Sequence, residues 1–327
     1  MLRYLLKRIL YLLPTLLGVN LLVFAMFFVV NSPDDMAKQF LGEKASTPEQ
    51  IERWKASRGY DLPLCFNRGA RGFGKVTRTI LWRKSIALFW GDFSNTDHSG
   101  VSIRRELSHR VLPSFALALP VFLITLFINV VLAMKLAGQR GTAFDTAGQF
   151  LCVVLMSIST LLFIIFGQYL IARILRLAPV SGFASGWGLA QFLVLPAFVG
   201  ILSGIGSGTR LYRTFFLEQI GQDYVRTARA KGVSELMVVA KHALKNALTP
   251  VITYLGPLVA GLLTGSFVVE RLFSVPGVGR YFVQSVSDRD YTMIMGIVIF
   301  FGIFVVICNL ISDILLALID PRVKLHS

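Results

Sequence analysis

The chain has 327 residues, of which 54% are hydrophobic and 16% charged, and its mean hydropathy is +0.66. This balance excludes an ordinary soluble domain and indicates that much of the chain has lipid as its solvent. The formal net charge of +15 does not indicate nucleic-acid binding, because the basic residues lie in separate islands between apolar runs.

Six long apolar runs follow one another along the chain. They cover residues 9–34, 111–134, 146–172, 177–209, 246–269 and 291–312. Each reaches the roughly 20 residues that a helix needs to cross about 30 Å of hydrocarbon. The first run is longer than the apolar part of a signal peptide and lacks a small-residue cleavage pattern, so we expect it to be retained. The sequence therefore predicts an all-α, polytopic membrane protein with six transmembrane helices.

Between the first two runs, residues 31–110 are polar and rich in turn signals, and we expect a long external segment there. A short exposed helix is predicted over residues 49–58, with Thr47 as N-cap and Pro48 in its first turn. Residues 69–75 have the spacing of a phosphate loop, but Val76 stands where magnesium ligation needs Ser or Thr. No nucleotide site is therefore predicted.

The distribution of Lys and Arg orients the chain. With both termini inside, the cytoplasmic segments hold 14 basic residues and the short external loops hold 5, as the positive-inside rule requires. The expected organisation is an N-terminus and first transmembrane helix over 1–30, an external segment over 31–110, a five-helix core over 111–320 and a cytoplasmic tail over 321–327. The core includes a cytoplasmic loop over 210–246, between the fourth and fifth helices.

This loop contains a candidate short helix. Residues 217–231 lack proline, Gly232 comes where a helix C-cap would fall, and Arg229 and Lys231 suit the negative end of a helix dipole. A second helix is predicted to begin at Ser234 and to end near Pro250. From these residues alone, a docking element for a soluble partner and an ordinary solvated basic loop both stay open.

The spans contain small residues at helical spacing. Glycine recurs at every fourth residue in Gly200, Gly204 and Gly208, and again in Gly261 and Gly265. This spacing predicts close packing of helix backbones, with a moving or pore-lining face as the alternative. Asp313 lies in the sixth run, about 10 Å of helix from the cytoplasmic end, where we expect it to reach water or pair with a basic loop residue.

Signals for catalysis or for a cofactor are missing from the sequence. The three cysteines, Cys65, Cys152 and Cys308, are too few and too scattered for a disulfide framework. The four histidines lack metal-ligand spacing, and no nucleophile elbow is found. We therefore expect neither an enzyme nor a metal or cofactor site.

The loop resembles that of permease subunits in binding-protein-dependent ABC importers, and among these the oligopeptide/dipeptide/nickel branch. Members in general have Glu-Ala-Ala, three residues and then Gly; aligned on Gly232, this chain has Arg226, Thr227 and Ala228 in the first three places. The peptide branch shares this departure, and its Asp-Tyr-Val-Arg-Thr-Ala-Arg-Ala-Lys-Gly pattern stands here from Asp223 to Gly232.

The resemblance extends over nearly the whole chain. Further matching segments are Arg8–Pro14, Gly91–Phe93, Leu177–Gly182, Leu195–Ala197, His242–Pro250, Val269–Gly279, Arg289–Tyr291, Asn309–Asp313 and Asp320–Arg322. The chain departs from the family at Leu161 and Thr292, where proline is common, and has an apparent insertion around residues 67–79.

The resemblance implies a transmembrane permease subunit in the bacterial inner membrane. It implies a second permease, two cytoplasmic ATPase subunits and an extracytoplasmic substrate-binding protein as partners, with peptides as substrates and ATP hydrolysis in the ATPases. The implied ATPase-docking residues are Asp223, Tyr224, Arg226, Thr227, Ala228, Arg229, Lys231 and Gly232. Ala228 would allow close approach and Gly232 the turn, and no residue of the substrate path is assigned.

Three alternatives stay open at this point. An importer of the same kind could carry nickel or another small solute. A secondary transporter or channel would work without an ATPase, but it should leave ionisable residues near the bilayer midplane, where only Asp313 is available. A membrane scaffold would need no substrate path.

Overall fold

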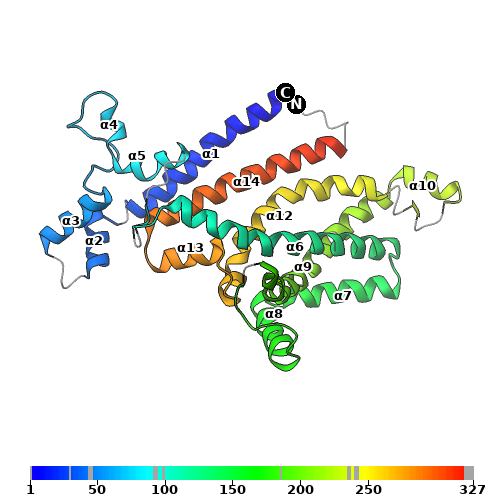
Figure 1. Cartoon of the computed structure of the whole chain (residues 1–327). Helices are drawn as coiled ribbons and strands as arrows, with labels where there is room; N and C mark the ends of the chain where they lie inside the picture. The colour runs from blue at the N-terminus through cyan, green and yellow to red at the C-terminus, as the bar shows by residue number, and fades with distance from the viewer. Residues whose placement is uncertain are drawn as a thin grey trace. The chain divides into compact units, whose positions relative to one another are not determined.

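The computed structural model describes residues 2–28, 31–42, 47–90, 95–97, 100–184, 186–233, 237–238 and 243–319 (Figure 1). Every regular element in these ranges is a helix, apart from an isolated antiparallel bridge between Asn95 and Ser102. The predicted all-α class is therefore confirmed. The described residues fall into two compact units, one of residues 1–109 with 281–306 and the other of residues 110–280 with 307–319.

Three described helices are long and apolar enough to cross a membrane: α6 (Ile103–Gly138), α9 (Leu189–Ile220) and α14 (Tyr291–Ile319). Two bent pairs bring the number of candidate spans in the described residues to as many as five. These are α1 (Leu2–Phe28) with α2 (Pro33–Leu41), and α7 (Ala143–Ser157) with the helices that follow it. The fifth apolar run also forms a helix, α12 (Leu244–Leu272).

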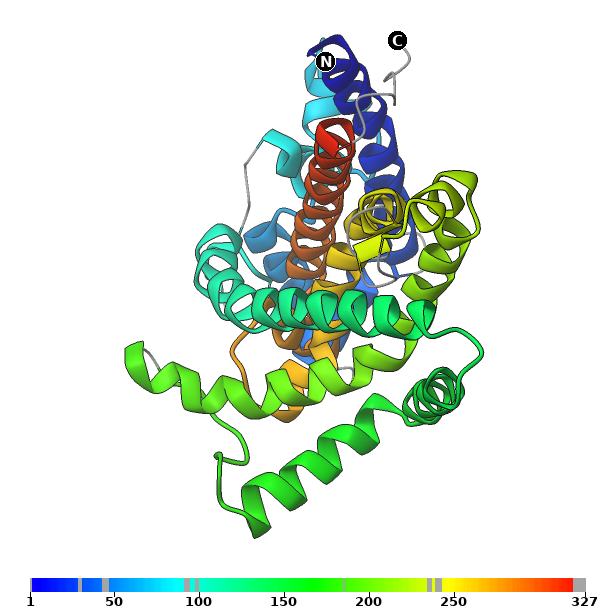
Figure 2. The same cartoon turned by 90° about the vertical axis from the view of Figure 1, so that its right-hand side faces the viewer.

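The third apolar run is broken instead of forming one helix. After α7 the chain continues as α8 (Thr160–Gly167) and the π-helix η2 (Gln168–Ile174), with a bend of 89°. In Figure 2, α7 is seen nearly end-on while α8 runs across the view. The break arises because Ile158 is extended and the Ser159 side chain caps α8 by accepting a hydrogen bond from Leu161 N at 3.3 Å. The bend therefore forms with leucine, not proline, at position 161.

The first unit contains the short helices of residues 31–110: α2, α3 (Pro48–Arg58), α4 (Gly74–Thr77), α5 (Ile80–Lys84) and the 3₁₀-helix η1 (Ile86–Trp90). The predicted helix at 49–58 is confirmed as α3, with Thr47 as N-cap, Pro48 in the first turn and Gly59 in the left-handed conformation at its end. One face of α3 is not exposed as expected, because Trp54 is buried in a hydrophobic cluster.

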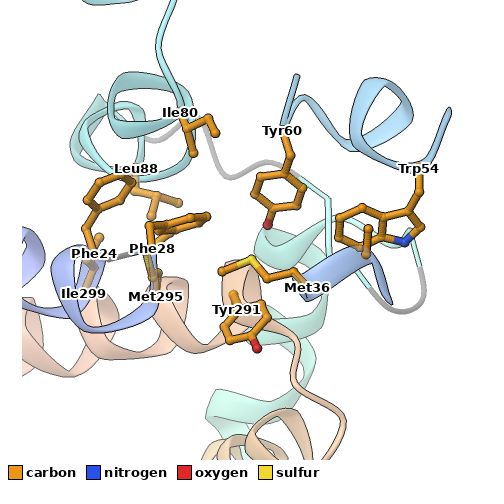
Figure 3. Close-up of a cluster of buried hydrophobic side chains, with 11 residues drawn as sticks. Phe24, Phe28, Met36, Trp54, Tyr60, Ile80, Leu88, Tyr291, Met295 and Ile299 are labelled. Atoms are coloured by element: carbon orange, nitrogen blue, oxygen red, sulfur yellow. The ribbon is translucent and has the colours of Figure 1, made fainter. Parts of the chain in front are cut away.

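This cluster joins α1, the short helices and the first turns of α14 (Figure 3). Phe24 and Phe28 of α1 stack on each other and lie near Met295 and Ile299. Burial of such side chains is worth about 1.5–3 kcal/mol each. The cluster is thus the main apolar core of the first unit.

A buried polar network lies beside the cluster. Asp97 accepts hydrogen bonds from Tyr60 Oη at 2.5 Å and Thr292 Oγ1 at 2.6 Å, and it pairs with Lys84 Nζ at 3.4 Å. Burial, followed by the neighbouring Asp97, raises the pKa of the Tyr60 phenol well above its usual value, so Tyr60 stays a donor. Thr292 supplies both its side chain and its backbone N–H to Asp97.

In the second unit, α6 and α9 pack closely at the predicted glycines. A Cβ added at Gly200 would lie 3.0 Å from Val121, one at Gly204 would lie 2.9 Å from Thr125, and one at Gly208 would overlap the Asn129 amide. The prediction of tight packing is confirmed for these three positions. Among the described residues, a Cβ at Gly261 would have no heavy atom within 4 Å, and the side-chain surroundings of Gly265 lie outside the description. Gly256, which the spacing did not single out, lies directly against Asn309.

A buried carboxylate holds the turn that follows α12. Glu270 is fully buried and accepts hydrogen bonds from Ser114 Oγ at 2.7 Å and Arg280 N at 2.9 Å. Ser114 in turn accepts one from Val278 N at 2.8 Å, so two backbone donors in the first turn of α13 (Val278–Ser287) are satisfied by side chains. A Cβ at Gly277 would overlap the Glu270 carboxylate, which explains the glycine there.

Candidate functional site

The predicted docking helix is present as α10 (Asp223–Ala230), labelled in Figure 1. It is shorter than the predicted helix over 217–231, because residues 217–220 belong to α9. Gln222 has φ −76° and ψ 153°, an extended conformation that ends one helix and begins the next. The sequence signal for this break was Gly221, which the expectation had placed inside a single helix.

The C-terminal end of α10 agrees with the prediction at Gly232. This residue has φ +77°, its N–H bonds to Arg229 O at 2.9 Å, and Val233 N bonds to Ala228 O at 3.4 Å. This pair of bonds defines a Schellman motif, in which a left-handed glycine ends the helix and satisfies its last carbonyls. Gly232 is therefore required for its backbone conformation.

One face of α10 is buried within the chain itself. Val225 is 0% exposed and Ala228 6% exposed, and they form a small cluster with Val238 and the partly buried Val233. The Val233 contact is the apolar contact that accompanies a Schellman motif. Ala228, expected at the partner surface, thus faces inward and fixes α10 to the residues that follow it.

The other face of α10 is exposed and charged. All six of the remaining predicted docking residues are exposed: Asp223, Tyr224, Arg226, Thr227, Arg229 and Lys231. Arg226 Nη1 lies 3.4 Å from Asp223 Oδ1, with side chains 74% and 95% exposed, so this contact adds little stability. Tyr224 Oη donates to Gln219 Oε1 at 3.0 Å, which ties the exposed face to the end of α9.

A buried ion pair lies seven residues before the end of α9. Arg213 donates to the two carboxylate oxygens of Asp145 at 2.8 and 2.7 Å, and Gly141 N donates to the same carboxylate at 3.2 Å. The side chains are 14% and 4% exposed. This bidentate pair joins α9 to the start of α7. Sequence reasoning counted Arg213 only as a loop charge and did not single out Asp145, although Thr142 and Asp145 have the spacing of a helix N-cap.

Beneath α10, aromatic residues of α9 join the helices of the second unit. Tyr212 and Phe216 are 2% and 1% exposed and pack with Ala133 of α6 and with Ala247 and Val251 of α12. Native-density packing transmits displacement between helices instead of absorbing it. A force on α10 would therefore act on α6, α7 and α12 through the last turns of α9.

Other predicted features lie outside this site. The predicted start of the second loop helix at Ser234 falls outside the described residues. Its predicted end near Pro250 is wrong, since α12 continues through this proline to Leu272; helices of membrane proteins tolerate proline because neighbouring groups satisfy the freed carbonyl. Asp313 is half-buried in α14.

The geometry can be compared with known proteins. Residues 129–325 match the family model of the binding-protein-dependent transport system inner membrane component. The dipeptide transport system permease DppB of Bacillus subtilis is 34% identical over 329 aligned residues, which cover 100% of this chain and 99% of the relative. The chain belongs to this family.

Two further relatives match over the same extent. A putative peptide transport system permease of Brucella abortus is 33% identical and covers 98% of both chains. The glutathione transport system permease GsiC of Salmonella paratyphi A is also 33% identical and covers 99% of both chains. The resemblance to ABC importer permeases of the peptide branch is thus confirmed, and the protein is a membrane permease subunit.

Proposed function

We propose that the chain is the membrane-spanning subunit of an ATP-driven importer for peptides. The family assignment and the dipeptide, peptide and glutathione permeases among its relatives support this function. In the proposal the chain crosses the inner membrane six times, with residues 1–30, 31–110, 111–320 and 321–327 organised as the charge distribution predicts and both termini in the cytoplasm. A second permease completes the path, and a binding protein delivers the peptide.

The observation that carries the proposal is the two-faced geometry of α10. Its buried face holds the helix to the permease through Val225 and Ala228, and its other face carries exposed charged side chains. A docking helix needs both a fixed position on the permease and an exposed face for the partner, and α10 has both. Together with the family assignment, this geometry supports a docking element.

Each exposed residue has a physical role in the proposed interface. Arg226, Arg229 and Lys231 meet an acidic surface of a cytoplasmic ATPase, one ATPase for each permease, with Asp223 and Thr227 at the edge. Tyr224 contributes apolar area, as tyrosine does in interface centres. Gly232 lets the chain turn back, and buried Ala228 packs α10 against the residues that follow it.

Coupling follows from the contacts below the helix. When the ATPases close on ATP, they displace α10, and the Arg213–Asp145 pair and the Tyr212–Phe216 packing carry this displacement into α7, α6 and α12. The membrane helices then alternate between outward and inward access. In this mechanism the chain needs no nucleotide site of its own.

The proposal is tested by reversing one exposed charge. Arg226→Glu should reduce co-purification of the ATPase and abolish ATP-dependent peptide uptake, while membrane insertion stays normal. Arg68→Glu is the matched control, because Arg68 is also exposed but lies in the segment expected outside. Normal ATPase association in Arg226→Glu, with full uptake, would count against docking at α10.

Deleting the ATPase tests the class of transporter. An importer loses uptake altogether, whereas a secondary transporter or channel keeps it. Deleting the permease itself tests the scaffold alternative, which predicts unchanged uptake. The substrate is tested by identifying what co-purifies with the cognate binding protein, where a nickel chelate in place of a peptide would redirect the assignment.

A further inference from the structure

The first unit contains an open cleft that the coupling mechanism does not use. Its volume is about 410 Å³, and its lining includes the aromatic residues Phe40, Trp54 and Tyr291 and the charged residues Asp97, Asp288 and Arg289. Ligand pockets of proteins measure about 300–1,000 Å³, so the cleft is large enough for a short peptide. Its lining comes from residues 36–97 and 287–291, two segments that the charge distribution places on the external side.

Arg289 is held in a conformation that favours glycine. Its φ is +56°, and it follows α13 at the position where Gly232 follows α10. Arg289 N bonds to Val286 O at 3.2 Å and Asp290 N bonds to Ser285 O at 2.9 Å, which again makes a Schellman motif. An arginine at this position is strained, and strain of this kind is concentrated at functional sites.

Within the described part of the chain, neither Arg289 nor Asp288 forms a salt bridge. Arg289 is exposed, and its guanidinium donates no hydrogen bond and forms no ion pair to a described residue. Asp288 accepts hydrogen bonds from Gln284 Nε2 at 3.1 and 2.9 Å but has no basic partner there. Asp97 differs, because Lys84, Tyr60 and Thr292 already satisfy its carboxylate.

The aromatic wall is firmly held. Trp54 is 6% exposed and stacks on Tyr60 with ring centroids 5.4 Å apart, and Arg58 lies over the rings of Phe40 and Trp54 at 4.6 and 4.8 Å. In Figure 3, Trp54, Met36 and Tyr291 lie together at one end of the buried cluster. The indole N–H of Trp54 has no acceptor among the described residues, so the wall also holds an unmet hydrogen-bond donor.

We propose that this cleft binds a short peptide with free termini. Arg289 pairs with the terminal carboxylate, for which its guanidinium offers two parallel donors. Asp288 pairs with the terminal ammonium, and the aromatic wall packs against an apolar side chain. A simple anion or cation would use only one of the two charges, whereas a zwitterionic peptide uses both. This site rests on the proposed function in peptide import, to which it adds a subsite on the permease itself.

Peptide analogues test the two charges separately. The full-length permease is purified with its partner subunits in lipid nanodiscs, without the binding protein, and titrated calorimetrically with Ala-Phe, Ala-Phe-amide and N-acetyl-Ala-Phe. Arg289→Gln should weaken Ala-Phe binding about tenfold, as expected for a lost charge-assisted pair, and should leave the already weaker binding of the amide unchanged. Asp288→Asn should weaken Ala-Phe and leave N-acetyl-Ala-Phe unchanged. Arg280→Gln, at the other end of α13, is the matched control and should change none of them.

Arg289→Gly separates ligand binding from structural support. It should raise the midpoint of thermal unfolding, because the strain is relieved, while it weakens Ala-Phe binding as Arg289→Gln does. A merely structural arginine would lose stability and affinity together.

Three outcomes would overturn the peptide site. The first is no saturable Ala-Phe binding by the unmodified protein, and the second is an equal loss for free and amidated peptides in Arg289→Gln. The third, from a separate titration with the binding protein, is that Arg289→Gln loses association with that protein while its Ala-Phe binding is unchanged. The last would make the cleft a docking site for that protein. Uptake that continues without the ATPase would instead refute the proposed function and leave the measured binding intact.

Discussion

Substitution of Gly232 tests whether the conformation of the α10 terminus governs docking of the ATPase. At φ +77° an L-residue is strained, and a Cβ would meet nothing within 4 Å. Gly232→Ala and Gly232→Val therefore introduce no collision, and their effect comes from backbone strain alone. The left-handed conformation costs an L-residue roughly 1–2 kcal/mol.

The expected loss of ATPase affinity depends on how strictly docking requires the native conformation of this turn. If the turn must be in its native conformation for the ATPase to bind, a cost of about 1 kcal/mol weakens binding about fivefold, and about 2 kcal/mol weakens it about thirtyfold. We expect Gly232→Ala near the lower value and Gly232→Val near the higher, because β-branched residues tolerate positive φ least. Gly232→Asn should change binding the least, since asparagine adopts this conformation more readily.

The assay is titration of nanodisc-embedded permease with the purified ATPase, together with peptide-stimulated ATP hydrolysis. The thermal unfolding midpoint of each variant serves as the control for the fold. Affinities of the alanine and valine variants within twofold of the unmodified protein, or an asparagine variant as weak as alanine, would refute the reasoning.

Three further predictions concern the stability of the membrane units, each measured by thermal unfolding in detergent. Asp145→Asn should cost about 3 kcal/mol, because it leaves a buried arginine without its countercharge; an unchanged midpoint would contradict this. Gly208→Ala should destabilise by about 1–3 kcal/mol through overpacking, whereas Gly261→Ala should be tolerated, and equal effects would argue against the α6–α9 contact. Thr292→Val should cost about 1–3 kcal/mol, because Asp97 loses a buried donor; full stability would mean that Lys84 and water satisfy this carboxylate.

The sequence predicted the parts of the fold that depend on local chemistry. Thr47 and Pro48 mark the start of α3 by capping rules, and Gly232 marks the end of α10 by its tolerance of positive φ. The spacing of Gly200, Gly204 and Gly208 identified a packing face because residues four apart lie on one side of a helix. These signals work because each is a property of a few neighbouring residues.

Predictions failed where local rules compete or where partners are distant in the chain. The third apolar run predicted one helix, yet α7 ends at Ser157 and Ser159 caps the start of α8, because a hydropathy pattern does not reveal a capping serine. Pro250 suggested a helix end, but α12 continues through it. The Arg213–Asp145 pair spans 68 residues, so no local pattern could join them.

By itself, the sequence determined that this is a helical membrane protein and where α10 ends, because apolar run length and glycine conformation are properties of neighbouring residues. Only the tertiary structure decided which face of α10 is open, since burial of Val225 and Ala228 depends on Val238. It likewise decided that Arg289 and Asp288 share a cleft with Trp54, more than two hundred residues away in the chain. Such groupings are set by packing between distant segments, which no short stretch of sequence records.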